Sequence, residues 1–227
     1  MVWPVWAVVV AGGSGSRYGR PKQFDLLAGR PVVAWSVEAA RCVARGVVLV
    51  APPGREGDCL AYGADAVVTG GATRSASVRR GLAAVPEDVP VVVVHDAARP
   101  LASASLFAAV VEPLLPGDRS APEVDAVVCG LPVADTLKRL ADDGATVTGT
   151  VDRSGLVAVQ TPQAFRADVL RRAHADGADA TDDAALVEAL GGVVQVVPGE
   201  AHNVKVTLPS DLAFLQMVVA GAVPVPP

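Results

Sequence analysis

The sequence is poor in the residues that build disulfide frameworks and metal sites. It contains three cysteines and three histidines in 227 residues. Cys42, Cys59 and Cys129 lie far apart and form no CxxC pair, and the histidines form no HxxxH grouping. We therefore expect reduced cysteines, as in a cytoplasmic protein, and no structural metal site.

Positive charge and long apolar runs are also scarce. A formal net charge of −5 argues against a nucleic-acid-coating protein, because such proteins need broad positive fields. The N-terminus lacks the basic start of a signal peptide, and the apolar stretch 212–227 is short and ends in prolines, so we expect no membrane association. Three of the 19 basic residues are lysines, Lys22, Lys138 and Lys205. A compact ammonium suits a phosphoryl oxygen, which draws attention to them.

The pattern that the chain does have is that of an α/β fold. Short β-branched runs alternate with segments of helical periodicity, and strands are predicted at 5–10, 47–50, 66–69, 91–94 and 125–129. This alternation predicts one domain, 1–227, with a mostly parallel central sheet and helices on both faces. We also expect Pro31 at a first helical position, and Thr73 and Thr181 as helix caps.

After Cys129 the rhythm changes to that of a hairpin. Leu137–Leu140 and the alternating stretch Thr146–Val151 flank the turn residues Asp142-Asp143-Gly144. The segment 136–160 is therefore predicted to be a protruding β-arm, with a two-faced pattern suited to packing on another surface.

The first apolar run ends in a glycine-rich loop, residues 11–23, with the sequence AGGSGSRYGRPKQ. Glycines let backbone N–H groups approach an anion, and Arg17, Arg20 and Lys22 add positive charge. A dinucleotide fingerprint would need a glycine where Tyr18 stands, and a Walker loop would need GKS or GKT. We predict a triphosphate site here, the alternative being a glycine turn with solvated arginines.

Two further segments place polar residues where strands end. The segment 95–100, HDAARP, follows the strand at 91–94, and ligands of open α/β sheets bind at that edge. Asp96 can hold hydroxyls or a hydrated Mg²⁺ and Arg99 can hold a phosphate, or the two can form a local ion pair. The segment 70–77 joins a strand to a helix start, which can receive an anion or a base edge.

Seven motifs occur in an order and spacing that match one family. They are the glycine loop with its Pro-Lys-Gln end, HDAARP at 95–100, DTLK at 135–138, TVDR at 150–153, QTPQ at 160–163, TDD at 181–183 and NVKVT at 203–207. From about Val5 to Leu215 the sequence closely resembles the 2-C-methyl-D-erythritol 4-phosphate cytidylyltransferase family.

The resemblance implies a Rossmann-like nucleotidyltransferase fold, a homodimer interlocked by the β-arms, and Mg²⁺-dependent transfer of CMP from CTP to the sugar phosphate in isoprenoid biosynthesis. It implies that Arg17 and Lys22 stabilise the transition state, while Arg153 and Lys205 orient the attacking phosphate. The implied CTP-binding residues are Ala11, Gly12, Gly13, Gly15, Gly71, Ser77 and Asp96. The implied sugar-phosphate residues are Asp96, Arg99, Thr136, Arg153, Thr181 and Lys205, with Thr161 a further candidate.

In the implied dimer, Thr136 and Arg153 reach across from the other subunit. Mg²⁺ is expected to bind mainly through the CTP phosphates, with Asp96 as a candidate ligand. Gly12 and Ala72 depart from the family pattern, which commonly has an alanine and a polar or acidic residue there.

Two other functions stay open on sequence grounds. A sister cytidylyltransferase acting on ribitol 5-phosphate shares fold and mechanism, although Ala98 favours methylerythritol phosphate. A non-catalytic nucleotide-binding protein is the second alternative, disfavoured by the presence of both Arg17 and Lys22. An NAD-dependent dehydrogenase fits less well, because Ala51-Pro52-Pro53 stands where an acidic residue would end the second strand.

Overall fold

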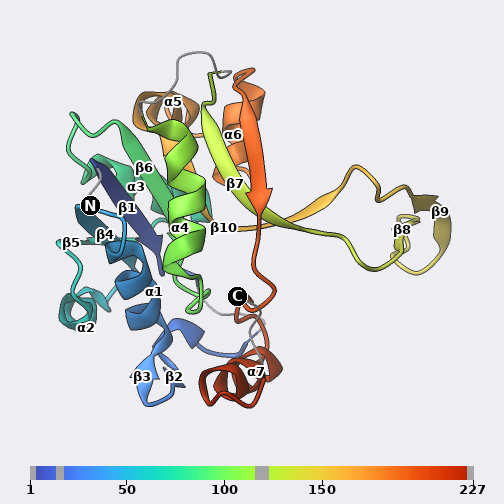
Figure 1. Cartoon of the computed structure of the whole chain (residues 1–227), viewed down its shortest axis with the longest axis horizontal. Coiled ribbons are helices and arrows are strands. Elements are labelled where there is room, and N and C mark those ends of the chain that lie inside the picture. Colours follow the sequence, from blue (N-terminus) through green and yellow to red (C-terminus); the bar gives the residue numbers. More distant parts are fainter. Residues whose placement is uncertain (1–3, 14–17, 116–122, 224–227) are drawn as a thin grey trace.

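A computed structural model describes residues 4–13, 18–115 and 123–223 of the chain. Its centre is a seven-stranded sheet in the order β11-β7-β10-β6-β1-β4-β5 (Figure 1). The strands of this sheet are β1 (Val5–Val10), β4 (Gly46–Ala51), β5 (Ala66–Thr69), β6 (Val91–Asp96), β7 (Ala126–Pro132), β10 (Val157–Arg166) and β11 (Val194–Pro198).

Parallel pairing dominates this sheet. β1 pairs in parallel with β4 and β6, β4 with β5, and β11 with β7. β10 runs antiparallel to both of its neighbours, β6 and β7. The carboxyl ends of β1, β4, β5 and β6 therefore meet at one edge of the sheet, where β1 is followed by the glycine loop, β5 by the segment 70–77, and β6 ends in Asp96.

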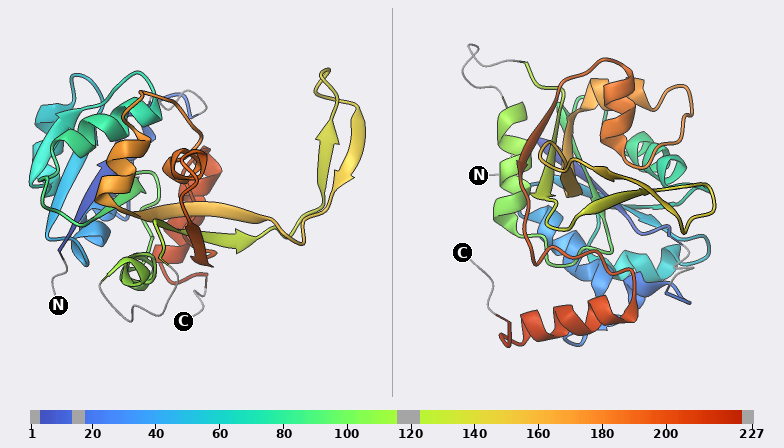
Figure 2. Two further views of the ribbon diagram at one scale, coloured as in Figure 1. Left: turned by 90° about the horizontal axis from the view of Figure 1, so that it is seen from above. Right: turned by 90° about the vertical axis from the view of Figure 1, so that its right-hand side faces the viewer.

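Helices cover both faces of the sheet, as predicted (Figure 2). On one face α1 (Val32–Arg41) packs against β1 and β4, and α4 (Ala104–Val111) packs against β7 and β10. On the other face lie α3 (Arg74–Ala83), α5 (Ala167–Ala173) and α6 (Asp183–Ala189). The remaining helices are α2 (Glu56–Cys59) and α7 (Pro209–Val219). Within the described residues, no helix has the length and apolar character needed to cross a bilayer.

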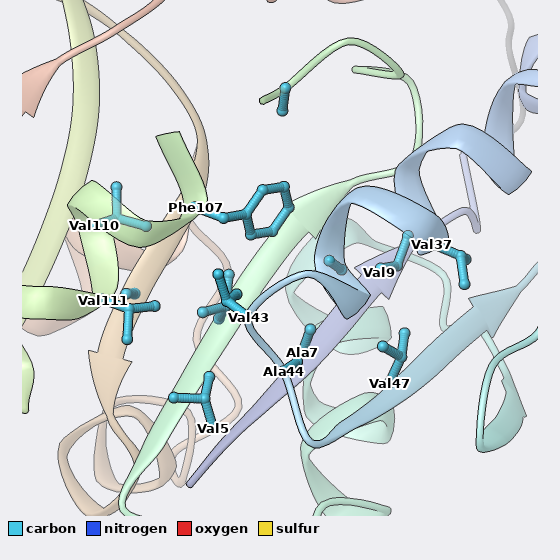
Figure 3. Packing of buried hydrophobic residues seen from close by; sticks show 14 of the residues in the cluster. Val5, Ala7, Val9, Val37, Val43, Ala44, Val47, Phe107, Val110 and Val111 are labelled. Atoms are coloured by element: carbon cyan, nitrogen blue, oxygen red, sulfur yellow. The ribbon is translucent and has the colours of Figure 1, made fainter. Parts of the chain in front are cut away.

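Alternating side chains let each central strand fill both halves of the core. In β1, Val5, Ala7 and Val9 join the cluster beneath α1 and α4, which Figure 3 shows, whereas Val8 joins the cluster on the opposite face. All residues of β4 and β6 are buried. The sheet is thus held on both sides, which makes its carboxyl edge a rigid support for the site.

A third cluster anchors the C-terminal segment. Leu27, Val32, Val206 and Leu215 are buried together, so α7 and the strand-free segment before it pack beside β2 (Leu26–Leu27) and β3 (Arg30–Pro31). This packing brings the segment with Lys205 back to the sheet edge, where the Val206 N–H donates to the Ala98 carbonyl (2.8 Å).

β7 and β10 lead out of the sheet into a long arm, which carries the predicted hairpin at its end (Figure 2). β8 (Leu137–Leu140) and β9 (Val147–Val151) pair antiparallel and confirm that hairpin. The arm exposes a set of apolar side chains to solvent, namely Leu137, Leu140, Val147, Leu156, Val157 and Val159.

Two local predictions at helix starts are wrong, and one is confirmed. Pro31 pairs with Leu26 in β3 and is the N-cap, so α1 begins one residue later. Thr181 does not cap α6, because Asp182 is the N-cap and its carboxylate, the stronger acceptor, receives the Ala185 N–H (3.0 Å). Thr73 does cap α3, since its hydroxyl accepts the Ala76 N–H (3.0 Å).

Candidate functional site

A cavity of about 530 Å³ opens at the carboxyl ends of β1 and β6. It lies between the glycine loop, the start of α3 and the segment before α7. The predicted site residues that line this larger cavity are Ala11, Gly12, Gly13, Lys22, Gly71, Ser77, Asp96 and Lys205. The fold thus brings together four segments that are far apart in the sequence.

A smaller cavity of about 240 Å³ adjoins it, between β6, β10 and the start of α6. It is lined by the predicted residues Arg99, Thr161 and Thr181, and by Gln160, Gln163 and Asp182. Arg74, Asp96 and Lys205 line both cavities. These three charged side chains therefore lie between two neighbouring cavities.

The glycine loop is tied to the residues that follow it. Gln23 is buried, and its side-chain Nε2 donates to the carbonyls of Ala11 (2.6 Å) and Gly13 (3.2 Å), which places Lys22 beside the loop. Arg20 does not line either cavity, because its guanidinium pairs with Asp25 (2.8 Å). Gly15 and Arg17, the other predicted loop residues, lie outside the described residues.

The start of α3 forms a tightly packed wall of the larger cavity. The Gly71 N–H donates to the Ser77 hydroxyl (3.0 Å), which itself donates to the Thr73 carbonyl (2.9 Å). A Cβ at Gly71 would lie 2.5 Å from the Ala76 Cβ, so only glycine fits there. A Cβ at Gly12 would lie 3.1 Å from the Ser77 Oγ, and the glycine at this position therefore leaves the Ser77 hydroxyl uncrowded.

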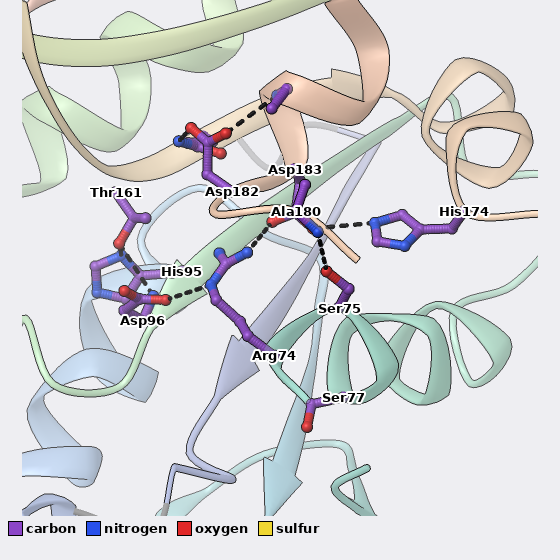
Figure 4. A network of polar contacts seen from close by, with 12 residues as sticks. Arg74, Ser75, Ser77, His95, Asp96, Thr161, His174, Ala180, Asp182 and Asp183 are labelled. Carbon is purple, nitrogen blue, oxygen red and sulfur yellow. Dashed lines mark hydrogen bonds and ion pairs between the residues drawn. The ribbon is translucent and has the colours of Figure 1, made fainter. Parts of the chain in front are cut away.

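A chain of charged side chains runs from the cavities into the core (Figure 4). Lys205 Nζ lies 2.6 Å from one Asp96 oxygen, and Arg74 Nε lies 3.2 Å from the other. Arg74 Nη1 also contacts Asp183 (2.7 Å), whose second oxygen lies 3.0 Å from His174 Nε2. Asp183 is fully buried, so Arg74 neutralises one carboxylate in the core and one at the site.

The charges in this cluster stabilise one another. Burial alone would raise the pKa of Asp96, but the positive charges of Arg74 and Lys205 outweigh it and hold that pKa well below its ordinary value. Burial would lower the pKa of Arg74, and the two carboxylates instead raise it. Asp96 and Arg74 are therefore both ionised at neutral pH.

Arg99 lies beside this cluster without pairing to Asp96 through its side chain. Its Nη1 donates to the Asn203 carbonyl (2.7 Å), and its Nε is buried without a partner. Burial lowers the pKa of Arg99, an effect that the nearby Asp96 partly offsets. The ion pair weighed as the alternative for Asp96 is thus replaced by contacts to Arg74 and Lys205.

Thr161 fixes the backbone on which Asp96 sits. Its Oγ1 accepts the Asp96 N–H (3.0 Å) and lies 3.2 Å from His95 Nδ1, while His95 Nε2 lies 3.1 Å from the Arg99 carbonyl. A carbonyl only accepts, so Nε2 carries the proton and Nδ1 accepts from the Thr161 hydroxyl. Burial lowers the pKa of His95 to about 4, which keeps the ring neutral in this arrangement.

The two predicted residues on the arm are not brought to the cavities of their own chain. Thr136 and Arg153 are exposed, and neither lines the larger or the smaller cavity. The Arg153 guanidinium donates to the carbonyls of Val133 and Ala134, across the base of the arm.

Sequence reasoning missed three residues that shape the site, Arg74, Gln23 and Gln163. Each stands inside a motif, yet the local pattern carries no sign of its partner. Arg74 and Asp183 are 109 positions apart, for example, and only the fold places them together.

The donor set for a cation is sparse. Among the described residues, no group of three or more His, Cys, Asp or Glu side chains is arranged to hold a metal ion. Asp96 is the one carboxylate that these residues contribute to the larger cavity, and each of its oxygens contacts a cationic side chain. A divalent cation would therefore need most of its oxygen ligands from a bound phosphate and water.

Comparison with known proteins shows the family to which the chain belongs. A sequence model of the family described as 2-C-methyl-D-erythritol 4-phosphate cytidylyltransferase matches residues 5–220. The chain is 45% identical to the protein of that name from Frankia casuarinae, over 97% of this chain and 83% of the relative. It is 42% identical to the one from Prochlorococcus marinus, over 94% and 97% of the two chains. The crystal structure of the Thermus thermophilus protein, 38% identical, matches with a TM-score of 0.77 over 94% of this chain and 98% of that one.

Proposed function

The chain belongs to the 2-C-methyl-D-erythritol 4-phosphate cytidylyltransferase family, and from this we infer that it transfers CMP from CTP to 2-C-methyl-D-erythritol 4-phosphate. The products are 4-diphosphocytidyl-2-C-methyl-D-erythritol and pyrophosphate, and the reaction serves isoprenoid biosynthesis. The observation that best supports this activity is the pair of adjoining cavities with Arg74, Asp96 and Lys205 between them. Two anionic substrates can then bind next to each other, one in each cavity, with the cations Arg74 and Lys205 between them.

We propose that CTP occupies the larger cavity. Ala11, Gly12 and Gly13 present backbone donors to its phosphates, and Lys22 lies on the same side of the cavity. The base lies toward Gly71 and Ser77. Arg17 and Gly15, which lie outside the described residues, stay predictions for the triphosphate.

The sugar phosphate occupies the smaller cavity, with its phosphate near Arg99 and Lys205 and its polyol near Thr181 and Asp96. A phosphate oxygen attacks the α-phosphorus of CTP in line, a new P–O bond forms, and the bond to the β-phosphate breaks with its electron pair leaving on pyrophosphate. No proton has to move, because a phosphate monoester is already anionic near neutral pH. The barrier is charge repulsion and growing charge on the leaving group, which fixed cations reduce.

Magnesium fits this site as part of the nucleotide substrate rather than as a cofactor held by the chain. Asp96, the one carboxylate that the described residues contribute to the larger cavity, would supply one oxygen, and the phosphates of CTP and water would supply the others. When bound, Mg²⁺ would neutralise charge on the phosphates of CTP.

The arm supports a proposal about assembly. It projects away from the domain and exposes apolar side chains such as Leu140 and Val147 (Figure 2). A second copy of the chain would cover them, and we propose a homodimer in which Thr136 and Arg153 complete the sugar-phosphate site of the other subunit.

The three free cysteines favour a cytoplasmic location.

The experiment that tests the activity follows pyrophosphate release from CTP with methylerythritol phosphate and, separately, with ribitol 5-phosphate. We expect release with the first and a much lower kcat/KM with the second, and loss of activity when Mg²⁺ is chelated. A higher kcat/KM with ribitol 5-phosphate would show that this sugar phosphate, and not methylerythritol phosphate, is the acceptor substrate. Binding of CTP without release from either would instead identify a non-catalytic nucleotide-binding protein.

A further inference from the structure

Gln163 is a buried glutamine in the wall of the smaller cavity, and half of its amide has no partner. It lies in β10, its side chain is 1% exposed, and its Nε2 donates to Asp182 Oδ2 (2.9 Å). Its Oε1 is buried without a hydrogen-bond partner. Buried polar atoms are rarely left in this condition, because each unpaired one loses its hydrogen bonds to water.

The chemistry of Asp182 decides which end of the amide is left over. A carboxylate accepts hydrogen bonds and does not donate, so the NH₂ group of Gln163 must face Asp182. Asp182 is itself held in place, since its other oxygen caps α6 through the Ala185 N–H (3.0 Å). The amide of Gln163 therefore cannot invert, and the atom of this cavity-lining residue that is left without a partner is its acceptor oxygen.

The unpaired atoms around this cavity are of two kinds. Arg74 Nη2 and Arg99 Nε are buried donors without partners, and Gln163 Oε1 is a buried acceptor without one. The phosphate group of a monoester is largely a dianion near neutral pH and then presents acceptor oxygens alone, so it can satisfy the two guanidinium groups but not the glutamine. The set matches a ligand that carries a phosphate together with hydroxyl groups.

We propose that Gln163 Oε1 accepts a hydrogen bond from a hydroxyl group of the polyol phosphate and so helps to select a hydroxylated acceptor. This assignment rests on the proposed function and deepens it by naming a specificity residue. Asp182 acts as the positioning residue that orients the amide. A site that hydrogen-bonds a substrate hydroxyl rejects an analogue lacking it, because the buried acceptor is then left unpaired.

The test compares the wild type with Gln163→Met, which keeps the length of the side chain and removes the amide. Pyrophosphate release is measured with CTP, methylerythritol phosphate and a series of analogues that each lack one hydroxyl. We expect kcat/KM of the variant for the full sugar phosphate to fall about tenfold or more, with KM for CTP unchanged. For one deoxy analogue, kcat/KM of the wild type should fall by the same factor relative to the full sugar phosphate. For the variant, kcat/KM should be the same with that analogue as with the full sugar phosphate.

Gln160→Met is the matched control. Gln160 lines the same cavity, but its amide is already used, with Nε2 donating to the Glu200 carbonyl (2.9 Å) and Oε1 accepting from Glu200 N (3.1 Å) and Asn203 Nδ2 (3.2 Å). Whatever this change does to stability, the relative losses across the deoxy series should match those of the wild type. Gln163→Asn, which retains an amide but draws it back from the cavity, replaces the methionine variant if that one does not fold.

The two proposals fail in different ways. A wild type that releases no pyrophosphate with the full substrates overturns the proposed function. A wild type that is active, but whose losses across the deoxy series are the same in the Gln163 variants, overturns the role of Gln163 alone. If Gln160→Met also abolishes the loss of kcat/KM that the wild type shows with the deoxy analogue, that loss reflects general packing of the cavity. This result would also contradict the proposal.

Discussion

Replacing Arg74 with methionine should destabilise the protein by removing the cation shared by two carboxylates. Arg74 is 22% exposed, Asp96 is 11% exposed, and Asp183 is completely buried. Leaving one partner of a buried pair uncompensated costs about 3–5 kcal/mol. His174 still contacts Asp183 and Lys205 still contacts Asp96, so we expect the lower end of that range, about 3 kcal/mol.

Urea unfolding at a fixed protomer concentration measures this loss, with the condition that the slope of the transition is unchanged. With a slope of about 2–3 kcal/mol per molar urea, the midpoint should fall by roughly 1–1.5 M. Arg41→Met is the matched control, because Arg41 pairs with Asp65 (2.9 Å) on the surface, where the two side chains are 40% and 41% exposed. Exposed pairs contribute under about 1 kcal/mol, so its midpoint should move little.

Arg74→Lys distinguishes charge from geometry. A single ammonium cannot span Asp96 and Asp183 as the guanidinium does, so lysine should recover only part of the lost stability. If Arg74→Met stays within about 1 kcal/mol of the wild type, the buried Asp183 does not depend on this cation and the reasoning is refuted.

Three further predictions concern substrate, pH and assembly. Lys205→Met should raise KM for the sugar phosphate about tenfold or more while changing stability little, because the lysine is 39% exposed; an unaltered kcat/KM would remove it from the site. Burial lowers the pKa of His95 to about 4 from its ordinary value of 6.5, so between these two pH values the unfolded chain binds more protons than the folded one. The resulting contribution of His95 to the free energy of unfolding, at most about 3 kcal/mol, is present above pH 6.5 and is lost as the pH falls toward 4. In urea titrations at pH 7 and pH 4.5, His95→Gln should therefore lose less stability between the two pH values than the wild type does. Equal losses in the two proteins would contradict this. Replacing 137–151 by a short linker should yield monomers in analytical ultracentrifugation, whereas unchanged sedimentation would exclude the arm as the dimer contact.

Local sequence patterns were enough for much of the fold. The apolar runs at 5–10 and 66–69 have the bounds of β1 and β5, and the hairpin of β8 and β9 lies where its turn residues indicated. These features depend on neighbouring residues alone, through side-chain alternation and turn preferences. The helix starts at Pro31 and Thr181 were less predictable, because a strand partner and a competing carboxylate decided them.

By itself, the sequence determined the order of elements, the glycine loop, and the motif set whose family the comparisons confirm. Only the tertiary structure decided that Arg74 joins Asp96 to Asp183, and that Gln163 keeps an unpaired acceptor in the smaller cavity. Partners of a buried charge or amide are set by packing between segments about a hundred positions apart, and no local pattern encodes which of several arginines will meet which carboxylate. The sequence therefore specifies which reactive side chains the motifs contain, while the fold decides which of these side chains pair with one another at the site.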